Sequence, residues 1–424
     1  MNIVIGKLGR SISSNSNKWS ATGGDNEPFI IFDSLARSFP EHTFYMIGKS
    51  DFFRNKYYNR PSNIINLWDS FKSKSYKHLP ILEGYKEQEK DEHKYIEKKI
   101  EELKSSNIKL DFGIIMAGPV SSINFSDKGL KKTDGSNEFA KTINIVKFYV
   151  SSLYEFLNET KTPWVCLGPD PRYFNFGKDL FNPPKKIISQ YNGKTTYKRF
   201  VSFKDQSLVE VTIPIEYKGF EKTFLIGRKK PVQIKKTKRM TIVLNEGGNK
   251  GLLRGPMLKE FILDHFEDVD VFGKWSDEWM KDPRFKGPKM FNDLQPFLYN
   301  AKYTFIIPIQ KGWTTAKIWE MIYYGIIPFM HPYYDSQRNL DVPEILRVSN
   351  PQELKERIDF LENNPDEYEY LLSSLYNLIE EEDLDGSNLL NNIMEEGYNI
   401  IGKTYKRKKF IKQENKSFFR MIGT

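Results

Sequence analysis

The sequence predicts an α/β protein with two Rossmann-like units in tandem and a helical C-terminal stretch. Short apolar runs typical of buried strands recur along the chain, and segments with helical apolar spacing separate them. The alternation stops in a basic, proline-bearing segment at 229–239 and restarts at Met240, which indicates an interdomain linker. The length of 424 residues also exceeds what one compact core usually holds.

The N-terminal unit opens as strand, helix and strand, which is the start of a Rossmann-like half. A charged, exposed helix and two further strands follow, with a helix between the two strands. In chain order, these segments are 2–6, 28–36, 42–48, 85–109, 112–117, 145–157 and 164–168. Residues 173–240 contain strands and basic loops to which the pattern assigns no bounds.

The C-terminal unit repeats the alternation. We expect strands at 240–244, 269–273, 303–307 and 326–330. We expect helices at 256–265, 316–324, 352–361 and 368–379.

Composition excludes several classes of protein. Hydrophobic residues make up 39% and aromatic residues 14% of the chain, so it is globular and not disordered. The single cysteine, Cys166, excludes a disulfide framework and fits a reducing cytosol. No stretch approaches the roughly 20 apolar residues of a membrane span, and Met1 leads directly into a strand without a signal-peptide layout. We therefore expect a cytoplasmic protein with no membrane partner.

The net charge of +9, with a pI near 9.1, is compatible with a polyanionic partner such as DNA. Lysine and arginine cluster around 229–239 and 403–409. These clusters either line a groove or simply keep linker segments solvated, and the charge alone does not distinguish these two roles.

The segment from Leu244 to Arg254 runs from a strand through a glycine-rich turn into a helix. Gly247 and Gly248 allow backbone N–H groups to approach a phosphate closely, and the helix N-terminus adds partial positive charge. Lys250 and Arg254 are four residues apart and share a face on a first helical turn. The segment suits a diphosphate such as that of a nucleotide-sugar, or it is an ordinary strand–turn–helix with a solvated basic face.

Two further pairs of charged residues are candidates for chemistry. Lys317 and Glu320 share a helical face. Either the carboxylate accepts hydrogen bonds from both hydroxyls of a ribose, or the two residues form an ordinary ion pair. Asp170 and Arg172 follow a strand end, where α/β proteins place functional side chains. There the aspartate is a competent general base, or the segment is an exposed Asp-Pro turn.

Asp268-Val269-Asp270 matches the D-x-D pattern of metal-dependent sugar transferases, but we expect no metal there. It leads into an apolar strand, with no loop to hold an ion between the two aspartates. The histidines and Cys166 have no zinc spacing, and neither a P-loop nor a G-x-S-x-G motif occurs.

Four segments, three of them described above, occur in the family's order and make the chain resemble the DNA β-glucosyltransferases of T-even bacteriophages, which glucosylate 5-hydroxymethylcytosine. Asp170-Pro171-Arg172 matches the Asp-x-Arg of the family, and residues 317–320 match its Arg-Val-Trp-Glu. Residues 247–254 resemble its Gly-Gly-x-x-Arg-x-x-x-Arg with one residue fewer, and residues 121–125 repeat its Ser-Ser-Ile-Asn-Phe segment, which contains Ser122 and Asn124. The resemblance is best over 240–375 and patchy over 1–175.

The resemblance implies a GT-B fold, in which two Rossmann-like domains face a central cleft and C-terminal helices return to the N-terminal domain. We assign residues 1–235 to an acceptor (DNA)-binding domain with insertions, 236–395 to a UDP-sugar-binding domain, and 396–424 to a segment that crosses back. The insertions at 50–110 and 175–235 have no counterpart in the family that we can place.

The resemblance also implies roles for individual residues. Gly247, Gly248, Lys250 and Arg254 would bind the donor diphosphate, while Glu320 would hold the ribose with help from Lys317. Asp170 would be the catalytic base of an inverting transfer, and Arg172 would support it or the DNA. Ser122 and Asn124 would lie on the acceptor side. The implied donor is UDP-glucose, with Mg²⁺ or Mn²⁺ as a non-essential activator.

The implied acceptor is double-stranded DNA that carries a modified pyrimidine, either 5-hydroxymethylcytosine or 5-hydroxymethyluracil. The protein would then act as a monomer in the cytoplasm of the infected host cell. Lys250 and Lys317 replace two arginines of the family pattern and lose the bidentate guanidinium fork, which leaves room for a different donor. Two alternatives stay open: a GT-B enzyme acting on a polysaccharide, a protein or an already glycosylated base, and a non-catalytic DNA-binding protein.

Overall fold

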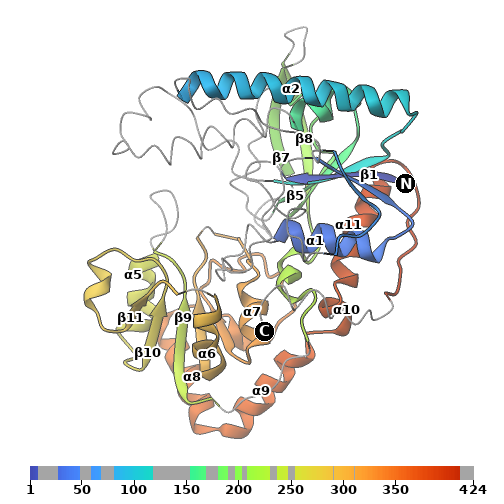
Figure 1. The fold of residues 1–424 in the computed structure, drawn as a ribbon. Helices are drawn as coiled ribbons and strands as arrows, with labels where there is room; N and C mark the ends of the chain where they lie inside the picture. Colours follow the sequence, from blue (N-terminus) through green and yellow to red (C-terminus); the bar gives the residue numbers. More distant parts are fainter. Residues whose placement is uncertain are drawn as a thin grey trace.

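The chain folds around two separate β-sheets, each covered by helices, in a computed structural model (Figure 1). The structure describes residues 1–7, 27–47, 59–67, 81–117, 153–168, 180–189, 196–202, 208–229, 236–246, 254–289, 291–309 and 311–410. No helix within these ranges is long and apolar enough to cross a membrane.

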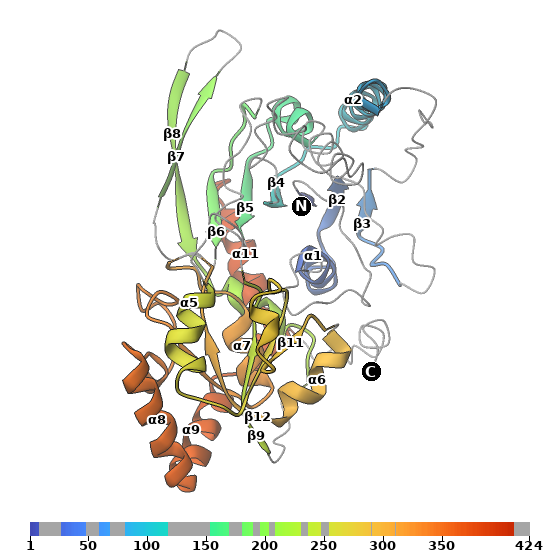
Figure 2. The same ribbon diagram turned by 90° about the vertical axis from the view of Figure 1, so that its left-hand side faces the viewer.

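The first sheet has the order β3-β2-β1-β4-β5-β6-β8-β7. Its strands are β1 (Asn2–Lys7), β2 (Thr43–Ile47), β3 (Ile64–Asn66), β4 (Phe112–Met116), β5 (Trp164–Gly168), β6 (Lys186–Ser189), β7 (Thr196–Ser202) and β8 (Leu208–Tyr217). All neighbours pair in parallel except β7 and β8, which form an antiparallel hairpin. This hairpin projects beyond the other strands (Figure 2).

Helices lie on both faces of the first sheet. The side chains of Ile3 and Ile5 in β1 join the core that contains α1 (Glu27–Ser38), whereas Val4 joins the core that contains α2 (Ile81–Ser105). Successive residues of a strand point to opposite faces, so a strand covered on both faces must be apolar throughout. This explains why continuous apolar runs identified these strands, and the predicted β-α-β opening is confirmed as β1-α1-β2.

The second sheet has the order β11-β10-β9-β12-β13 and is parallel throughout. Its strands are β9 (Lys238–Val243), β10 (Val269–Phe272), β11 (Phe285–Gly287), β12 (Ala301–Ile306) and β13 (Ile327–Met330). Its helices are α5 (Arg254–Leu258), η5 (Lys259–Leu263), α6 (Phe291–Asn300), α7 (Lys317–Tyr323), α8 (Pro351–Asn363) and α9 (Pro365–Asn377). With its first strand at the centre, this is the order of a Rossmann half, so the predicted fold class is confirmed.

Two local predictions differ from the structure. The helix expected at 256–265 is a short α-helix that continues as the π-helix η5, whose three apolar residues Phe261, Ile262 and Leu263 are all buried. The i→i+5 bonding of a π turn departs from the α-helical spacing that the sequence pattern assumes. The linker expected at 229–239 ends earlier, because Lys238 and Arg239 already belong to β9.

The C-terminal helices return to the first sheet, as expected. Helix α10 (Glu381–Leu384) leads into α11 (Ser387–Asn399), which packs on β4, β5 and α1 (Figure 1). The carboxylate of Glu396 in α11 accepts hydrogen bonds from Lys186 Nζ of β6 at 2.6 Å and pairs with Lys218 Nζ at 3.2 Å. The domain boundaries given above stay a prediction.

Candidate functional site

The carboxyl end of β9 is held in place by side-chain bonds to its neighbours. Arg254, the first residue of α5, donates from Nη1 to the carbonyl oxygen of Asn245 at 3.0 Å. Oδ1 of Asn245 accepts the backbone N–H of Lys274 at 2.8 Å, and Oε2 of Glu246 accepts that of Ser276 at 2.7 Å. The predicted diphosphate-binding turn therefore follows a strand end that these bonds hold in place. This end lies at the edge where parallel sheets bind ligands.

Helix α7 begins at the same edge, because it follows β12, the parallel neighbour of β9. Glu320 is only 1% exposed, and its Oε2 accepts a hydrogen bond from Lys317 Nζ at 2.5 Å. The ion pair that the spacing predicts is thus confirmed. Oε1 of Glu320 is buried and has no hydrogen-bond partner among the described residues.

The segment before α7 is clamped by one tyrosine. The hydroxyl of Tyr334 donates to the carbonyl oxygen of Thr315 at 2.6 Å and accepts the backbone N–H of Thr315 at 3.0 Å. The Tyr334 side chain is fully buried, so both bonds are shielded from water. They fix the backbone two residues before Lys317. Nothing in the sequence around Tyr334 indicated this role.

Burial raises the pKa of Glu320, and the nearby cations of Lys317 and Arg228 only partly offset this effect. Arg228 stacks on the ring of Phe224 at 3.7 Å and donates from Nε to the Phe224 carbonyl oxygen at 2.8 Å. An unpaired buried oxygen costs about 1–3 kcal/mol, so the apo protein is destabilised at this position. Such a group is typical of a binding site, where a ligand supplies the missing hydrogen bond.

Most of the other predicted site residues lie outside the described residues. They are Ser122, Asn124, Asp170, Arg172, Gly247, Gly248 and Lys250. Of the predicted set, the structure thus places Arg254, Lys317 and Glu320, and it puts all three at the carboxyl-terminal edge of the second sheet.

The two aspartates of the D-x-D pattern are engaged by lysines at the opposite edge of the sheet. Lys238 at the start of β9 forms ion pairs with both Asp268 and Asp270, the latter at 3.6 Å. Lys286 adds a second cation 3.7 Å from Asp270. The single lysine that bridges the two carboxylates confirms that they share one face of the strand. Within the described ranges, no group of three or more acidic, histidine or cysteine side chains is arranged to hold a metal ion.

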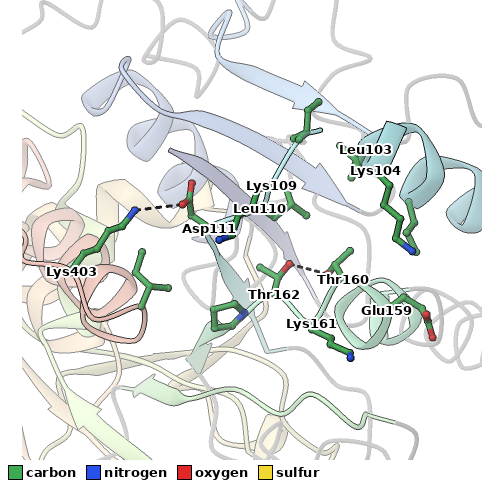
Figure 3. A pocket seen from close by; sticks show the side chains of 14 residues that line it. Leu103, Lys104, Lys109, Leu110, Asp111, Glu159, Thr160, Lys161, Thr162 and Lys403 are labelled. Carbon is green, nitrogen blue, oxygen red and sulfur yellow. Dashed lines mark hydrogen bonds and ion pairs between the residues drawn. The ribbon is translucent and has the colours of Figure 1, made fainter. Parts of the chain in front are cut away.

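A cavity of about 470 Å³ opens at the amino ends of β4 and β5, away from the residues just described (Figure 3). Its lining mixes apolar side chains with lysines and with Asp111 and Glu159. Lys403 pairs with Asp111 at 3.6 Å across one end of it. None of the predicted site residues lines this cavity, and it lies at the edge of the sheet that α/β proteins rarely use for ligands.

The fold is similar to that of solved DNA-modifying glucosyltransferases. A structure of T4 phage β-glucosyltransferase with its UDP-glucose substrate shares 14% identity with a TM-score of 0.55, over 94% of this chain and 99% of that one. A DNA-modifying β-glucosyltransferase solved with and without uridine diphosphoglucose shares 14% identity with a TM-score of 0.54. T4 phage β-glucosyltransferase with UDP and Mn²⁺ shares 14% identity with a TM-score of 0.53. Each match covers 95% of this chain and 99% of the other. No protein-family model and no curated protein sequence matches the chain.

The resemblance inferred from four short motifs is therefore confirmed for the fold. At 14% identity the shared architecture says nothing by itself about substrates. Function has to be argued from the side chains.

Proposed function

We propose that this protein is an inverting, UDP-sugar-dependent DNA glycosyltransferase that modifies the hydroxymethyl group of a pyrimidine, with glucose as the expected sugar. Three features support the proposal: the fold, the ordered motifs and the Lys317–Glu320 pair. The observation that carries it is Oε1 of Glu320, which is buried at the carboxyl edge of the second sheet and has no hydrogen-bond partner in the described part of the chain. The proposal includes action as a monomer in the host cytoplasm.

The donor would bind between the β9 turn and α7. Glu320 Oε1 would accept a ribose hydroxyl, which removes the cost of its unmade hydrogen bond. Lys250, Arg254 and Lys317 would balance the charge of the diphosphate, which the turn at Gly247 and Gly248 would approach through backbone N–H groups. Mg²⁺ or Mn²⁺ would act at most as an activator on the diphosphate.

The acceptor chemistry would rest on Asp170, two residues beyond the end of β5. Its carboxylate would remove the proton of the hydroxymethyl group as that oxygen attacks the anomeric carbon. The bond from the anomeric carbon to the diphosphate would break on the opposite face, releasing UDP with inversion. Arg172 would orient Asp170 or hold a DNA phosphate, and Ser122 and Asn124 would lie beside the extruded base. Extrusion costs a few kcal/mol.

The direct test is incubation of the protein with a panel of UDP-sugars and duplexes that carry cytosine, 5-hydroxymethylcytosine or 5-hydroxymethyluracil. Mass spectrometry of the digested nucleosides should show one sugar increment on one modified base. UDP-sugar hydrolysis with no increment on any duplex would contradict the proposed acceptor and favour a polysaccharide, protein or pre-glycosylated base. Failure to bind any UDP-sugar would contradict the enzyme itself.

Replacing the proposed base separates chemistry from binding. We expect Asp170→Asn to lower the rate of transfer by about 10²–10⁴-fold, because no group then accepts the hydroxyl proton. The dissociation constant for UDP-glucose, measured by calorimetry, should stay near the wild-type value. Asp268→Asn is the matched control, since Asp268 pairs with Lys238 far from the proposed site and its loss should leave transfer unchanged. Near-normal turnover by Asp170→Asn would exclude this residue as the base.

A further inference from the structure

A second buried carboxyl group, Glu221, lies where the two sheets meet. It belongs to the 3₁₀-helix η4 (Phe220–Leu225), which directly follows the last strand of the first sheet and packs against α7 of the second. Helices α1, α10 and α11 also contact η4. Glu221 is only 3% exposed, and the sequence around it carries no recognisable motif.

One oxygen of this carboxyl group and two polar atoms near it are buried without a hydrogen-bond partner among the described residues. They are the hydroxyl of Tyr217, Oε2 of Glu221 and Nε1 of Trp319. The adjacent cation is engaged elsewhere, because Lys222 Nζ donates to Asp383 at 2.6 Å and lies 4.6 Å from the centre of the Trp319 ring. Each unsatisfied atom costs about 1–3 kcal/mol, so a cluster of three needs an explanation.

The cluster contacts the segment that carries the proposed donor site. Trp319 stands between Ile318 and Glu320 on α7, and the hydroxyl of Tyr217 interacts with Thr314. The neighbouring Thr315 is held at both backbone groups by Tyr334, whose hydroxyl lies within electrostatic reach of Glu221. The segment before Lys317 and the residue next to Glu320 thus both contact one buried polar cluster.

We propose that Glu221, in its neutral form, is a positioning residue for donor binding, which holds Trp319 and the first turn of α7 so that Glu320 and Lys317 meet the nucleotide. The inference rests on the proposed function. A neutral carboxyl group fits between a hydroxyl and an indole N–H without a counter-ion. Ionised Glu221 would place an uncompensated charge in the junction and loosen its packing against α7.

The electrostatic surroundings agree with a neutral Glu221. Burial raises its pKa, and the nearby polar groups of Tyr217 and Trp319 and the charge of Lys222 offset only part of the rise. Of the titratable groups, Tyr217, Lys222 and Tyr334 face it. The ionised side chains on the elements packed against η4 include Asp33 and Arg37 of α1, Lys317 and Glu320 of α7, Asp383 of α10, and Glu396 of α11, each of which pairs with another side chain.

The sign of the pH effect follows from the raised pKa. The packing is intact while Glu221 is protonated and weakens as the pH rises through its folded-state pKa. If only the protonated form holds α7 in place, UDP-glucose affinity falls about tenfold for each pH unit above that pKa. Glu221→Gln keeps the shape and the hydrogen-bonding groups but cannot ionise, so it should remove this dependence.

The test compares the full-length wild-type protein, Glu221→Gln and Glu396→Gln by calorimetry with UDP-glucose, from about pH 6 to about pH 8.5. We expect Glu221→Gln to match the wild type at low pH and to bind increasingly tighter than it as the pH rises. Glu396→Gln, which removes a buried glutamate paired with Lys186, should show the wild-type pH profile.

The outcomes separate the two proposals. A pH-independent ratio between Glu221→Gln and wild type, with donor binding intact, overturns the role of Glu221 but not the function. No binding of UDP-glucose by any variant at any pH overturns both. Hydrogen exchange of the amides of 314–324 in the ligand-free protein adds a second readout. If Glu221 positions α7, these amides should be better protected in Glu221→Gln than in the wild type at high pH. If the role of Glu221 is purely passive, the two proteins should show the same protection.

Discussion

Two buried carboxyl groups around α7 destabilise the ligand-free protein and have the hydrogen-bonding capacity to bind a ligand. Glu221 and Glu320 are both almost fully buried, each has a carboxyl oxygen without a hydrogen-bond partner in the described part of the chain, and burial raises the pKa of each. Protein cores rarely keep such groups unless a ligand or a functional constraint requires them. The two carboxyl groups therefore support the proposal that the α7 region binds the donor.

This arrangement predicts that stability and binding respond oppositely to Glu320→Gln. The amide avoids the cost of ionisation in a buried position, so the ligand-free variant should unfold at a higher urea concentration than wild type above neutral pH. The amide also accepts more weakly from a ribose hydroxyl, so UDP-glucose binding should weaken by about 1.5–3 kcal/mol, roughly 10- to 150-fold. Urea unfolding and calorimetry measure the two effects. A variant with unchanged donor affinity would remove Glu320 from the site.

The sequence indicated Lys317 and Glu320 because helical spacing is local, and a pair three residues apart is visible in one line of sequence. Tyr334 and Glu221 were not indicated. Both act on the same helix from positions distant in the chain, and neither belongs to a pattern. A residue whose role depends on a contact between separate elements leaves no periodic signal.

At the scale of elements, α11 approaches the first sheet at a glycine. A Cβ atom on Gly397 would lie 2.2 Å from Cε2 of Phe112, whose ring is fully buried in β4. The helix thus packs closer to the sheet than any side chain would allow. The ion pairs from Glu396 to Lys186 and Lys218 hold the same turn.

Gly397→Ala should therefore destabilise the protein by about 1–3 kcal/mol, although alanine is the better helix former by about 1 kcal/mol. Urea unfolding measures the change. Phe112→Leu vacates part of the ring volume, so in the Gly397→Ala background it should cost less than it does alone. Additive effects of the two substitutions would show that helix and sheet do not meet at these residues.

At the scale of the whole molecule, an excess of nine positive charges accompanies a fold shared with DNA-modifying enzymes. Among the described residues, Glu320 and Lys317 already pair with each other, and Lys238, Lys186 and Lys222 pair with acids. In 403–409, Lys403, Arg407 and Lys408 also pair with acids, so the surplus charge is carried by cations elsewhere in the chain.

If these charges serve DNA, binding must depend steeply on salt. We expect the logarithm of the association constant for a duplex to fall linearly with the logarithm of salt concentration, with a slope of about −0.9 for each phosphate neutralised. Fluorescence anisotropy with a labelled duplex measures the slope. If DNA binding showed no such slope and the protein instead bound uncharged oligosaccharides without UDP, the result would support the alternative acceptor.

The sequence by itself determined the class of fold, because strands covered on both faces must be continuously apolar and helices on their faces must be amphipathic. It also predicted residues near the strand ends for donor and acceptor binding, since turns that follow strands are local features, and most of these assignments stay predictions. It set no bounds for the strands within 173–240, which include the projecting β7–β8 hairpin, and it did not show the three-residue strands β3 and β11. Only the tertiary structure decided that Lys238 forms ion pairs with Asp268 and Asp270, that Tyr334 hydrogen-bonds to Thr315, and that the helix carrying Glu221 packs against α7. The physical reason is the same in each case: these contacts join residues far apart in the chain, and their energies depend on burial and distance, which only the packed molecule defines.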